Sequence, residues 1–291
     1  MTQKLLAIDI GGSSVKAGIW EQEQLTELPS FATPKTWEEM KAYLKSLVED
    51  YEITEGVAIS APGAVDADEG VIYGVSAVAY LHRFPIKKEL AAFLGMPVSF
   101  QNDANCAALA EIWQGNGKGL ESVALMIIGT GIGGGIALNG KLRTGAHLFG
   151  GEFGYQILNY DTLETLSELG SPVMMAKRYS KIKADGKKYT SKDVFKFAAT
   201  GEALAQEQIE RFYQAISMGI YNVLISLDPD RVLIGGGIST RDDLLPNLEE
   251  RVQHLLTKNG AKELTADIMP CRFLDQANLI GAIYQFLTER E

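Results

Sequence analysis

Asp103 lies at the junction between an apolar run and a helical pattern, where a carboxylate can take part in chemistry. Residues 96–100 indicate a short strand, and residues 104–113 carry apolar side chains at helical spacing. Asp103 is therefore expected close to the N-cap, where the helix dipole favours an ionised carboxylate. Such a carboxylate suits a general base, which must start deprotonated. The alternative is that Asp103 only caps the helix, since aspartate is a common cap.

Three glycine-rich turns, each directly after an apolar strand pattern, form a second group of candidate residues. The first joins residues 4–10, which include Asp9, to residues 15–20, and this pattern predicts a tight β-hairpin. Glycine lets backbone amides approach a phosphate, serine hydroxyls add donors, and Asp9 can face a phosphate-bound magnesium ion. The turn consists of Gly11, Gly12, Ser13 and Ser14. Taken alone, it also fits ordinary hairpin chemistry.

The other two glycine turns occur later in the chain. Residues 129–135 follow the apolar run 122–128 and contain five glycines. In a purely structural hairpin each glycine would cost about 0.5–1 kcal/mol relative to alanine, so we expect something to approach that backbone closely. The spacing matches neither a Walker P-loop nor a Rossmann fingerprint. The third turn, residues 235–239, follows a strand at 231–234. Together the turns indicate a ligand with phosphates, held in a cleft between two related lobes.

Chain length and composition predict the two lobes. At 291 residues the chain exceeds a typical single domain, and its hydrophobic content of 46% is sufficient for two cores. The glycine-rich segment 115–119 marks the expected boundary. We expect residues 1–117 to form the N-terminal lobe, residues 118–275 the C-terminal lobe, and a helix at about 276–291 to pack back on the first lobe. Other expected helices are residues 37–51, 85–94 and 208–226.

Charge and cysteine content exclude several classes of protein. A net charge of -10 argues against a nucleic-acid partner. No apolar run has transmembrane length, so no membrane partner is expected. Cys106 and Cys271 occupy unrelated positions and no signal peptide is found, which predicts a cytoplasmic protein.

Six short motifs occur along the chain, at residues 9–12, 60–66, 102–105, 129–135, 151–154 and 235–239. Their order is the one found in the ROK family of sugar kinases and repressors. The chain resembles that family along essentially its whole length. The resemblance implies an α/β, two-lobed, actin/hexokinase-like (ribonuclease H-like) fold, with duplicated domains around a cleft that holds a sugar and ATP.

The resemblance also implies roles for individual residues. Asp103 is the general base that takes the proton from a sugar hydroxyl, while Gly63, Asn102 and Glu152 bind the sugar. Asp9 and the glycine turns hold ATP and Mg²⁺, with Asp9 assigned to the metal. The residues assigned to the nucleotide are Asp9, Gly11, Gly12, Ser13, Ser14, Lys16, Thr130, Gly131, Gly133, Gly134, Gly236 and Gly237. For Lys16 the alternative is a solvated strand residue.

Departures from the family pattern concern zinc and the sugar. Most members have a histidine three residues after the glutamate, followed by a cysteine cluster, and together these bind a structural zinc ion. Here Tyr155 stands at the histidine position and residues 156–171 lack cysteine, so we expect no zinc site. Residues 146–155 and 79–82 resemble a zinc-less branch that includes β-glucoside kinases. That makes Tyr155, His147 and His82 candidate sugar neighbours, with surface or packing roles as the alternative for the histidines.

The predicted function is ATP-dependent transfer of the γ-phosphoryl group to a hydroxyl of a hexose or hexoside, with the C6 hydroxyl as the expected acceptor. The alternatives are a ROK-type sugar-sensing regulator without kinase activity, or a kinase for an N-acetylated hexosamine or fructose. Family regulators add an N-terminal helix-turn-helix, whereas the first strand here begins by Leu5, which favours a kinase. A filament or chaperone module would not explain Asn102, Asp103 and Glu152. The expected partner is a small-molecule sugar, and a homodimer is left open.

Overall fold

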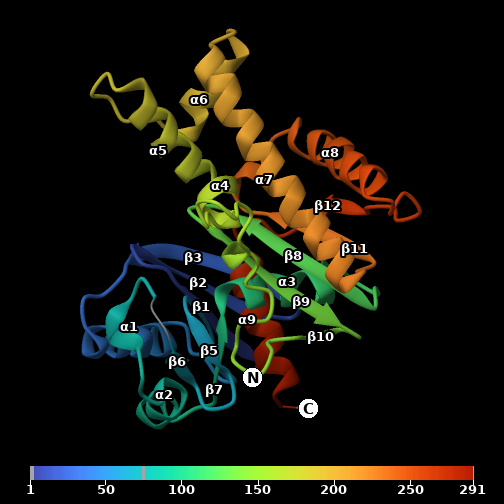
Figure 1. The fold of residues 1–291 in the computed structure, drawn as a ribbon. Coiled ribbons are helices and arrows are strands. Elements are labelled where there is room, and N and C mark those ends of the chain that lie inside the picture. Colours follow the sequence, from blue (N-terminus) through green and yellow to red (C-terminus); the bar gives the residue numbers. More distant parts are fainter. Residues whose placement is uncertain (1–2, 74–75, 291) are drawn as a thin grey trace. The chain divides into compact units, whose positions relative to one another are not determined.

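The computed structural model describes residues 3–73 and 76–290 (Figure 1). Its contacts divide the chain into two compact units. The first comprises the residues up to Lys118, Thr144–Phe149 and the segment from Asp275 onward, and the second comprises Gly119–Arg143 and Gly150–Leu274. The chain therefore contributes three separate segments to the first unit.

The first unit contains a five-stranded mixed sheet. Its strands are β1 (Lys4–Ile10), β2 (Ser14–Glu21), β3 (Gln24–Ala32), β4 (Gly56–Ala61) and β7 (Val98–Asn102). Their order is β3-β2-β1-β4-β7, in which β1, β2 and β3 pair antiparallel and β1, β4 and β7 pair parallel. The predicted hairpin at the start of the chain is confirmed.

Helices cover both faces of this sheet. They are α1 (Trp37–Asp50), α2 (Ile86–Leu94), α3 (Asp103–Gln114) and α9 (Ala277–Thr288). Along β1, Leu6 and Ile8 belong to the core shared with α1 and α2, whereas Leu5 and Ala7 pack with α3 and α9. Burial on both faces explains why β1 is a continuous apolar run. The remaining elements are β5 (Ala64–Asp66), β6 (Val71–Tyr73) and the short 3₁₀ helix η1 (Ala79–Leu81).

The second unit repeats this plan. Its strands are β8 (Ser122–Ile128), β9 (Ile132–Leu138), β10 (Lys141–Leu142), β11 (Arg231–Gly235) and β12 (Ile268–Pro270). Their order is β10-β9-β8-β11-β12, with an antiparallel hairpin on one side and parallel strands on the other. Its helical elements are η2 (Phe153–Tyr155), α4 (Leu166–Gly170), α5 (Pro172–Lys183), α6 (Ser191–Ala199), α7 (Ala203–Leu227), η3 (Gly237–Thr240) and α8 (Leu244–Lys258).

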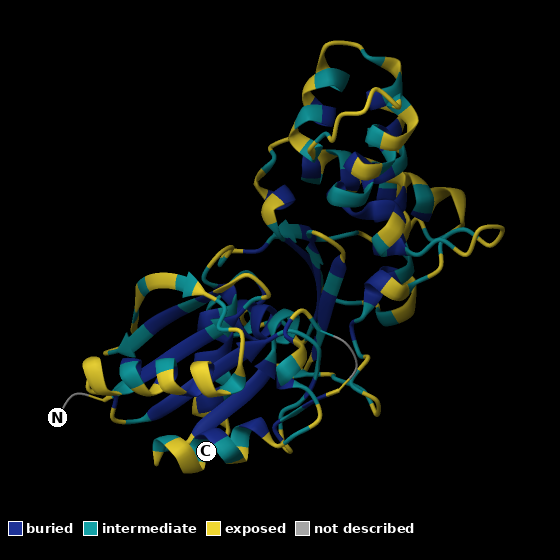
Figure 2. Ribbon diagram, turned by 90° about the vertical axis from the view of Figure 1, so that its left-hand side faces the viewer, coloured by how far each residue is buried: buried dark blue, intermediate teal, exposed yellow. Residues whose placement is uncertain are grey.

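The longest helix, α7, shows the periodicity that the sequence predicts. Phe212, Ile216 and Ile220 are fully buried on one side of α7, and the opposite side is exposed (Figure 2). Asp228 ends the helix in a left-handed conformation, and Pro229 follows it. Among the described residues, no helix is both long enough and apolar enough to cross a membrane.

The second glycine turn is shorter than predicted. Residues 133–135 lie inside β9, and the connection between β8 and β9 consists of residues 129–131. Periodicity could not show this boundary, because glycine contributes no side chain to a strand pattern.

Candidate active site

The predicted site residues are distributed over both units. The first unit contains Asp9, Gly11, Gly12, Ser13, Ser14, Lys16, Gly63, Asn102, Asp103 and His147. The second contains Thr130, Gly131, Gly133, Gly134, Glu152, Tyr155, Gly236 and Gly237.

The turn between β1 and β2 is closed by its own backbone. The Gly11 amide donates to the Ser14 carbonyl at 2.9 Å, and the Thr33 hydroxyl donates to the Gly11 carbonyl at 2.7 Å. A Cβ atom on Gly11 would lie 2.8 Å from the Ser14 oxygen, so the hairpin itself requires glycine. Gly12, Ser13 and Ser14 are exposed, and such a run of amides and hydroxyls can bind phosphate oxygens.

Asp9 lies near the end of β1 with one carboxylate oxygen engaged. Its Oδ1 accepts hydrogen bonds from Ser60 Oγ at 2.8 Å and from Asn278 Nδ2 at 3.1 Å. Burial raises the pKa of the Asp9 carboxyl above its usual value, and the bonds from Ser60 and Asn278 and the charge of Lys16 oppose that rise. The Lys16 ammonium lies 3.7 Å from Asp275. Within the described part of the chain no donor reaches Oδ2 of Asp9, so this oxygen suits a hard cation such as Mg²⁺.

Asp103 is the first residue of α3, and the helix cap is its neighbour. The N-cap is Asn102, whose Oδ1 accepts the Asn105 amide at 3.0 Å. Asp103 therefore lies next to the cap, as predicted, and the alternative in which Asp103 itself caps the helix is wrong. Asn102 Nδ2 also donates to the Gly63 carbonyl at 2.8 Å and to Asp103 Oδ1 at 3.0 Å. The Ala104 amide donates to the same Asp103 oxygen at 2.8 Å. Because Asn102 caps the helix, capping alone does not account for the carboxylate at position 103.

Cys106 follows Asp103 by three residues on α3 and is fully buried. Burial raises the pKa of the Cys106 thiol well above its usual value, and the charges of Asp9 and Asp103 add to that rise. Ser60 lies within hydrogen-bonding reach of the thiol and lowers the pKa. Both carboxylates therefore act on one buried thiol, although β1 and α3 are far apart in sequence.

In the second unit, two serines support the turn formed by residues 129–131. The Ser171 hydroxyl lies 2.8 Å from the carbonyl oxygens of both Gly129 and Thr130, and Ser167 Oγ accepts the Ile132 amide at 2.9 Å. Thr130 and Gly131 are exposed at the tip. Sequence reasoning missed both serines, because helix-starting serines carry no signal that points to a distant turn.

The chain's own backbone is what approaches the glycines of β9. A Cβ atom on Gly134 would lie 2.6 Å from the Gly151 carbonyl oxygen. Close packing of residue 151 on this strand explains Gly134 without any ligand. The packing also sets the start of the segment that carries Glu152.

Glu152 precedes the short helix η2, and Tyr155 is its last residue. Glu152 is partly buried, and burial raises the pKa of its carboxyl above the usual value. The Tyr155 side chain is 68% exposed. The two residues therefore differ in surroundings, and only Glu152 is partly removed from water.

The third glycine turn ends β11. Gly236 has a φ of 88°, and a Cβ atom there would overlap the Ile128 carbonyl oxygen, so only glycine fits. Gly237 has open space at its Cβ position and begins η3.

The histidines considered for the sugar differ in environment. His147 is exposed. His82 is partly buried and shares a 2.7 Å hydrogen bond with Ser76.

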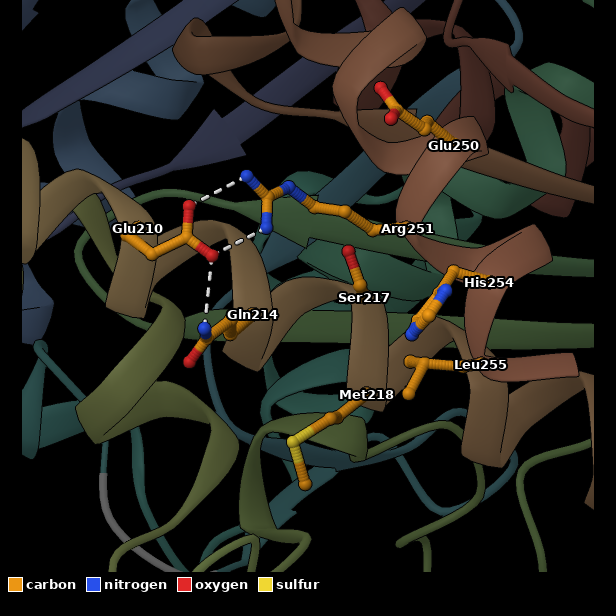
Figure 3. A pocket seen from close by; sticks show the side chains of 8 residues that line it. All are labelled: Glu210, Gln214, Ser217, Met218, Glu250, Arg251, His254 and Leu255. Carbon is orange, nitrogen blue, oxygen red and sulfur yellow. Dashed lines mark hydrogen bonds and ion pairs between the residues drawn. The ribbon is translucent and has the colours of Figure 1, made fainter. Parts of the chain in front are cut away.

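A separate pocket of about 510 Å³ lies between α7 and α8 (Figure 3). At one end Arg251 forms two hydrogen bonds, of 2.6 and 2.7 Å, with the Glu210 carboxylate. Ser217, Met218 and His254 also line it. None of the predicted sugar or nucleotide residues does, so this pocket is distinct from the predicted site.

The part of the chain that the structure describes contains no cluster of side chains suited to bind a zinc ion. Among those residues, no three histidine, cysteine, aspartate or glutamate side chains come together as possible ligands. The absence of structural zinc stays a prediction.

Comparison with known proteins adds the decisive observation, because a model of the ROK family matches residues 5–289. The chain belongs to the ROK family. It is 33% identical over 298 residues to a β-glucoside kinase of Listeria monocytogenes, covering 98% of each chain. An N-acetyl-D-glucosamine kinase of Vibrio cholerae is 30% identical over 272 residues, covering 86% of this chain and 89% of the other. A ROK family protein from Streptococcus pneumoniae, solved with sucrose, matches with a TM-score of 0.91 and 32% identity over 99% of each chain.

Family membership confirms two predictions. The α/β fold with two similar mixed sheets is that of ROK hexokinase-like structures. The chain is a ROK sugar kinase, which is a class of ATP-using transferase. The roles of individual residues and the identity of the sugar remain proposals.

Proposed function

We propose that the protein transfers the γ-phosphoryl group of ATP to a hydroxyl of a hexose or hexoside, with C6 as the acceptor position and Asp103 as the general base. The observation that carries this proposal is the orientation of the Asp103 carboxylate. Asn102 and the Ala104 amide both bond to its Oδ1, at 3.0 and 2.8 Å, at the start of a 12-residue helix. A base held in this way can orient a hydroxyl in line with the phosphorus atom, and phosphoryl transfer depends mainly on such positioning.

The remaining residues divide into sugar and nucleotide groups. Asn102, Gly63, Glu152, Tyr155 and His147 are proposed to contact the sugar. The three glycine turns, together with Lys16, are proposed to contact the nucleotide. Mg²⁺, when bound with ATP, would offset the negative charge of the polyphosphate. Asp9 would hold that ion through its carboxylate, directly or through water.

β-Glucosides are the first substrates to test, because a β-glucoside kinase matches the chain over 98% of its length. An N-acetylated hexosamine is the second candidate, since an N-acetyl-D-glucosamine kinase is 30% identical. An ATP-coupled assay with free hexoses, β-glucosides and N-acetylhexosamines would rank them by kcat/KM. If none of these compounds is phosphorylated, the proposed substrate class is wrong.

The substitution Asp103→Asn tests the role of the base. Asparagine keeps the size of the side chain and can still bond to a hydroxyl, but it cannot accept the proton. We expect kcat to fall about 10²–10⁴-fold, or roughly 3–5 kcal/mol of transition-state stabilisation, with sugar affinity changed far less.

Thermal melting of the same preparation provides the control. Because asparagine is compatible with the start of a helix, the melting temperature should stay close to that of the unmodified protein. A folded Asp103→Asn variant with activity within a few-fold of the unmodified enzyme would remove Asp103 from the mechanism.

A further inference from the structure

Asp9 is held by two side chains from different parts of the first unit, and no motif in the sequence contains both. Ser60 lies near the end of β4, while Asn278 lies 269 residues from Asp9, on α9. Both donate to Oδ1, at 2.8 and 3.1 Å. Two donors on one oxygen fix the rotation of the carboxylate, so they also fix where Oδ2 points.

The position of Asn278 is set by how α9 packs. Gly281, three residues later, sits so close to α3 that a Cβ atom would overlap the Cys106 carbonyl oxygen. At the start of the same helix, Gln276 donates to Glu27 at 2.5 Å, and Asp275 lies 3.7 Å from the Lys16 ammonium. The start of α9 is therefore attached to β2 and β3, the two strands that follow the first glycine turn.

Such an arrangement has a consequence for cation binding. A carboxylate attracts a divalent cation only when ionised and correctly aimed. The Ser60 hydroxyl and the Asn278 amide both donate to Oδ1 and hold the carboxylate in one orientation, which leaves Oδ2 to face a cation.

We propose that Asn278 is a positioning residue, which acts with Ser60 to hold Asp9 so that Oδ2 faces the Mg²⁺ of the bound nucleotide. This inference rests on the proposed function, in which Asp9 serves the metal–nucleotide complex. In this proposal Asn278 acts through Asp9 and contacts neither Mg²⁺ nor the sugar. Its effect should therefore appear in the dependence on Mg²⁺ and not in the binding of sugar.

The test measures ADP binding by calorimetry over a range of Mg²⁺ concentrations, which requires no turnover. We expect Asn278→Ala to raise the Mg²⁺ concentration that half-saturates tight ADP binding by about 5- to 20-fold, since hydrogen bonds to charged groups are among the stronger ones. ADP affinity without Mg²⁺ and sugar affinity should stay within about twofold of the unmodified protein. Ser60→Ala should shift the Mg²⁺ dependence in the same direction.

Gln276→Ala is the matched control, because it removes a side-chain amide from the same end of α9 whose bond goes to Glu27 instead of Asp9. It should leave the Mg²⁺ dependence unchanged. If Asn278→Ala behaves like Gln276→Ala, or weakens ADP binding equally with and without Mg²⁺, the inference is wrong. Should Asn278→Ala fail to fold, an unchanged Mg²⁺ dependence in Ser60→Ala would overturn it instead.

A further variant separates this inference from the proposed function. Asp9→Asn removes the charge that is proposed to hold the metal. If it alters the Mg²⁺ dependence while Asn278→Ala and Ser60→Ala do not, only the positioning role fails. If Asp9→Asn also leaves the Mg²⁺ dependence unchanged, the proposed role of Asp9 fails first.

Discussion

Partial burial changes the pKa of the Glu152 carboxylate. Burial raises the pKa of Glu152 above its usual value of about 4.3, and none of the described residues donates a hydrogen bond to its side chain that would oppose this rise. An ionised carboxylate accepts hydrogen bonds from sugar hydroxyls with both oxygens, whereas a protonated one accepts fewer and weaker bonds. Loss of the charge should therefore begin at a higher pH than for an ordinary glutamate.

Sugar binding should weaken as the pH falls from 7 through the raised pKa of Glu152. Calorimetry with sugar alone isolates this residue from Asp9, whose pKa is also raised but which is assigned to the nucleotide. Glu152→Gln should weaken binding at pH 7 and remove the dependence on pH. Equal pH profiles for the variant and the unmodified protein would contradict a role for Glu152.

Protonation of Glu152 should weaken sugar binding but increase the stability of the fold. The folded state disfavours the charged form of Glu152. At a pH above its folded-state pKa, the residue therefore lowers the free energy of unfolding. This loss of stability diminishes as the pH falls through the folded-state pKa and is absent below the unfolded-state pKa. Urea unfolding at pH 7 should therefore show Glu152→Gln to be at least as stable as the unmodified protein. A clear loss of stability in the variant would contradict this sign.

Among the secondary-structure elements, α3 and α9 come from distant parts of the chain and pack against each other in the first unit. Cys106, Leu279 and Ile283 share one buried cluster with β1. α3 begins with Asp103, and α9 carries Asn278. The spacing of these two helices therefore affects both carboxylates of the proposed site.

Gly281→Ala should destabilise the protein, although glycine to alanine in a helix is ordinarily favourable by about 0.5–1 kcal/mol. The added methyl group would overlap the Cys106 carbonyl oxygen, and overpacking of this kind costs about 1–3 kcal/mol or more. Urea unfolding measures the change. Thr288→Ala, at an exposed position near the end of α9, is the control and should change stability little. A stabilised Gly281→Ala variant would show that the helices can move apart freely.

At the scale of the whole molecule, each unit has its own sheet and its own buried core, and we predict that neither core requires a metal ion. The core of the second unit includes Phe153, Leu166, Met175, Phe212 and Ile216. The segment 156–171, where most family members are expected to place zinc ligands, instead forms turns and α4. Thr165 caps α4 through a capping box with Glu168, so this helix has a local cause in the sequence.

Purified protein should therefore contain no stoichiometric zinc and should melt at the same temperature with and without a chelator. In a protein held by structural zinc, chelation removes folding free energy and the fold is lost. Elemental analysis and thermal melting in EDTA measure both properties. About one zinc ion per chain, or unfolding on chelation, would contradict the prediction.

Local patterns determined most of the elements. The sequence predicts the apolar strand β1, the helical period of α7 and the glycine turns, because each of these features depends on residues that are close together in the chain. The candidate site residues that the sequence indicates are those that occur in short motifs, such as Asn102 and Asp103. Local patterns did not show which side chain makes which hydrogen bond, and the structure shows that Asn102 caps the helix while Asp103 lies next to the cap.

Only the tertiary structure decided which distant residues meet. Three contacts join segments that no periodicity connects. They are the hydrogen bond between Asp9 and Asn278, the bonds from two serines to residues 129–132, and the packing of Gly151 on Gly134. The sequence by itself determined where the chain can turn, which side chains must be buried, and which groups have the chemistry for phosphoryl transfer. Their mutual placement depends on how helices and strands pack, because packing satisfies volume and hydrogen bonding across the whole unit at once and leaves no local trace in the order of residues.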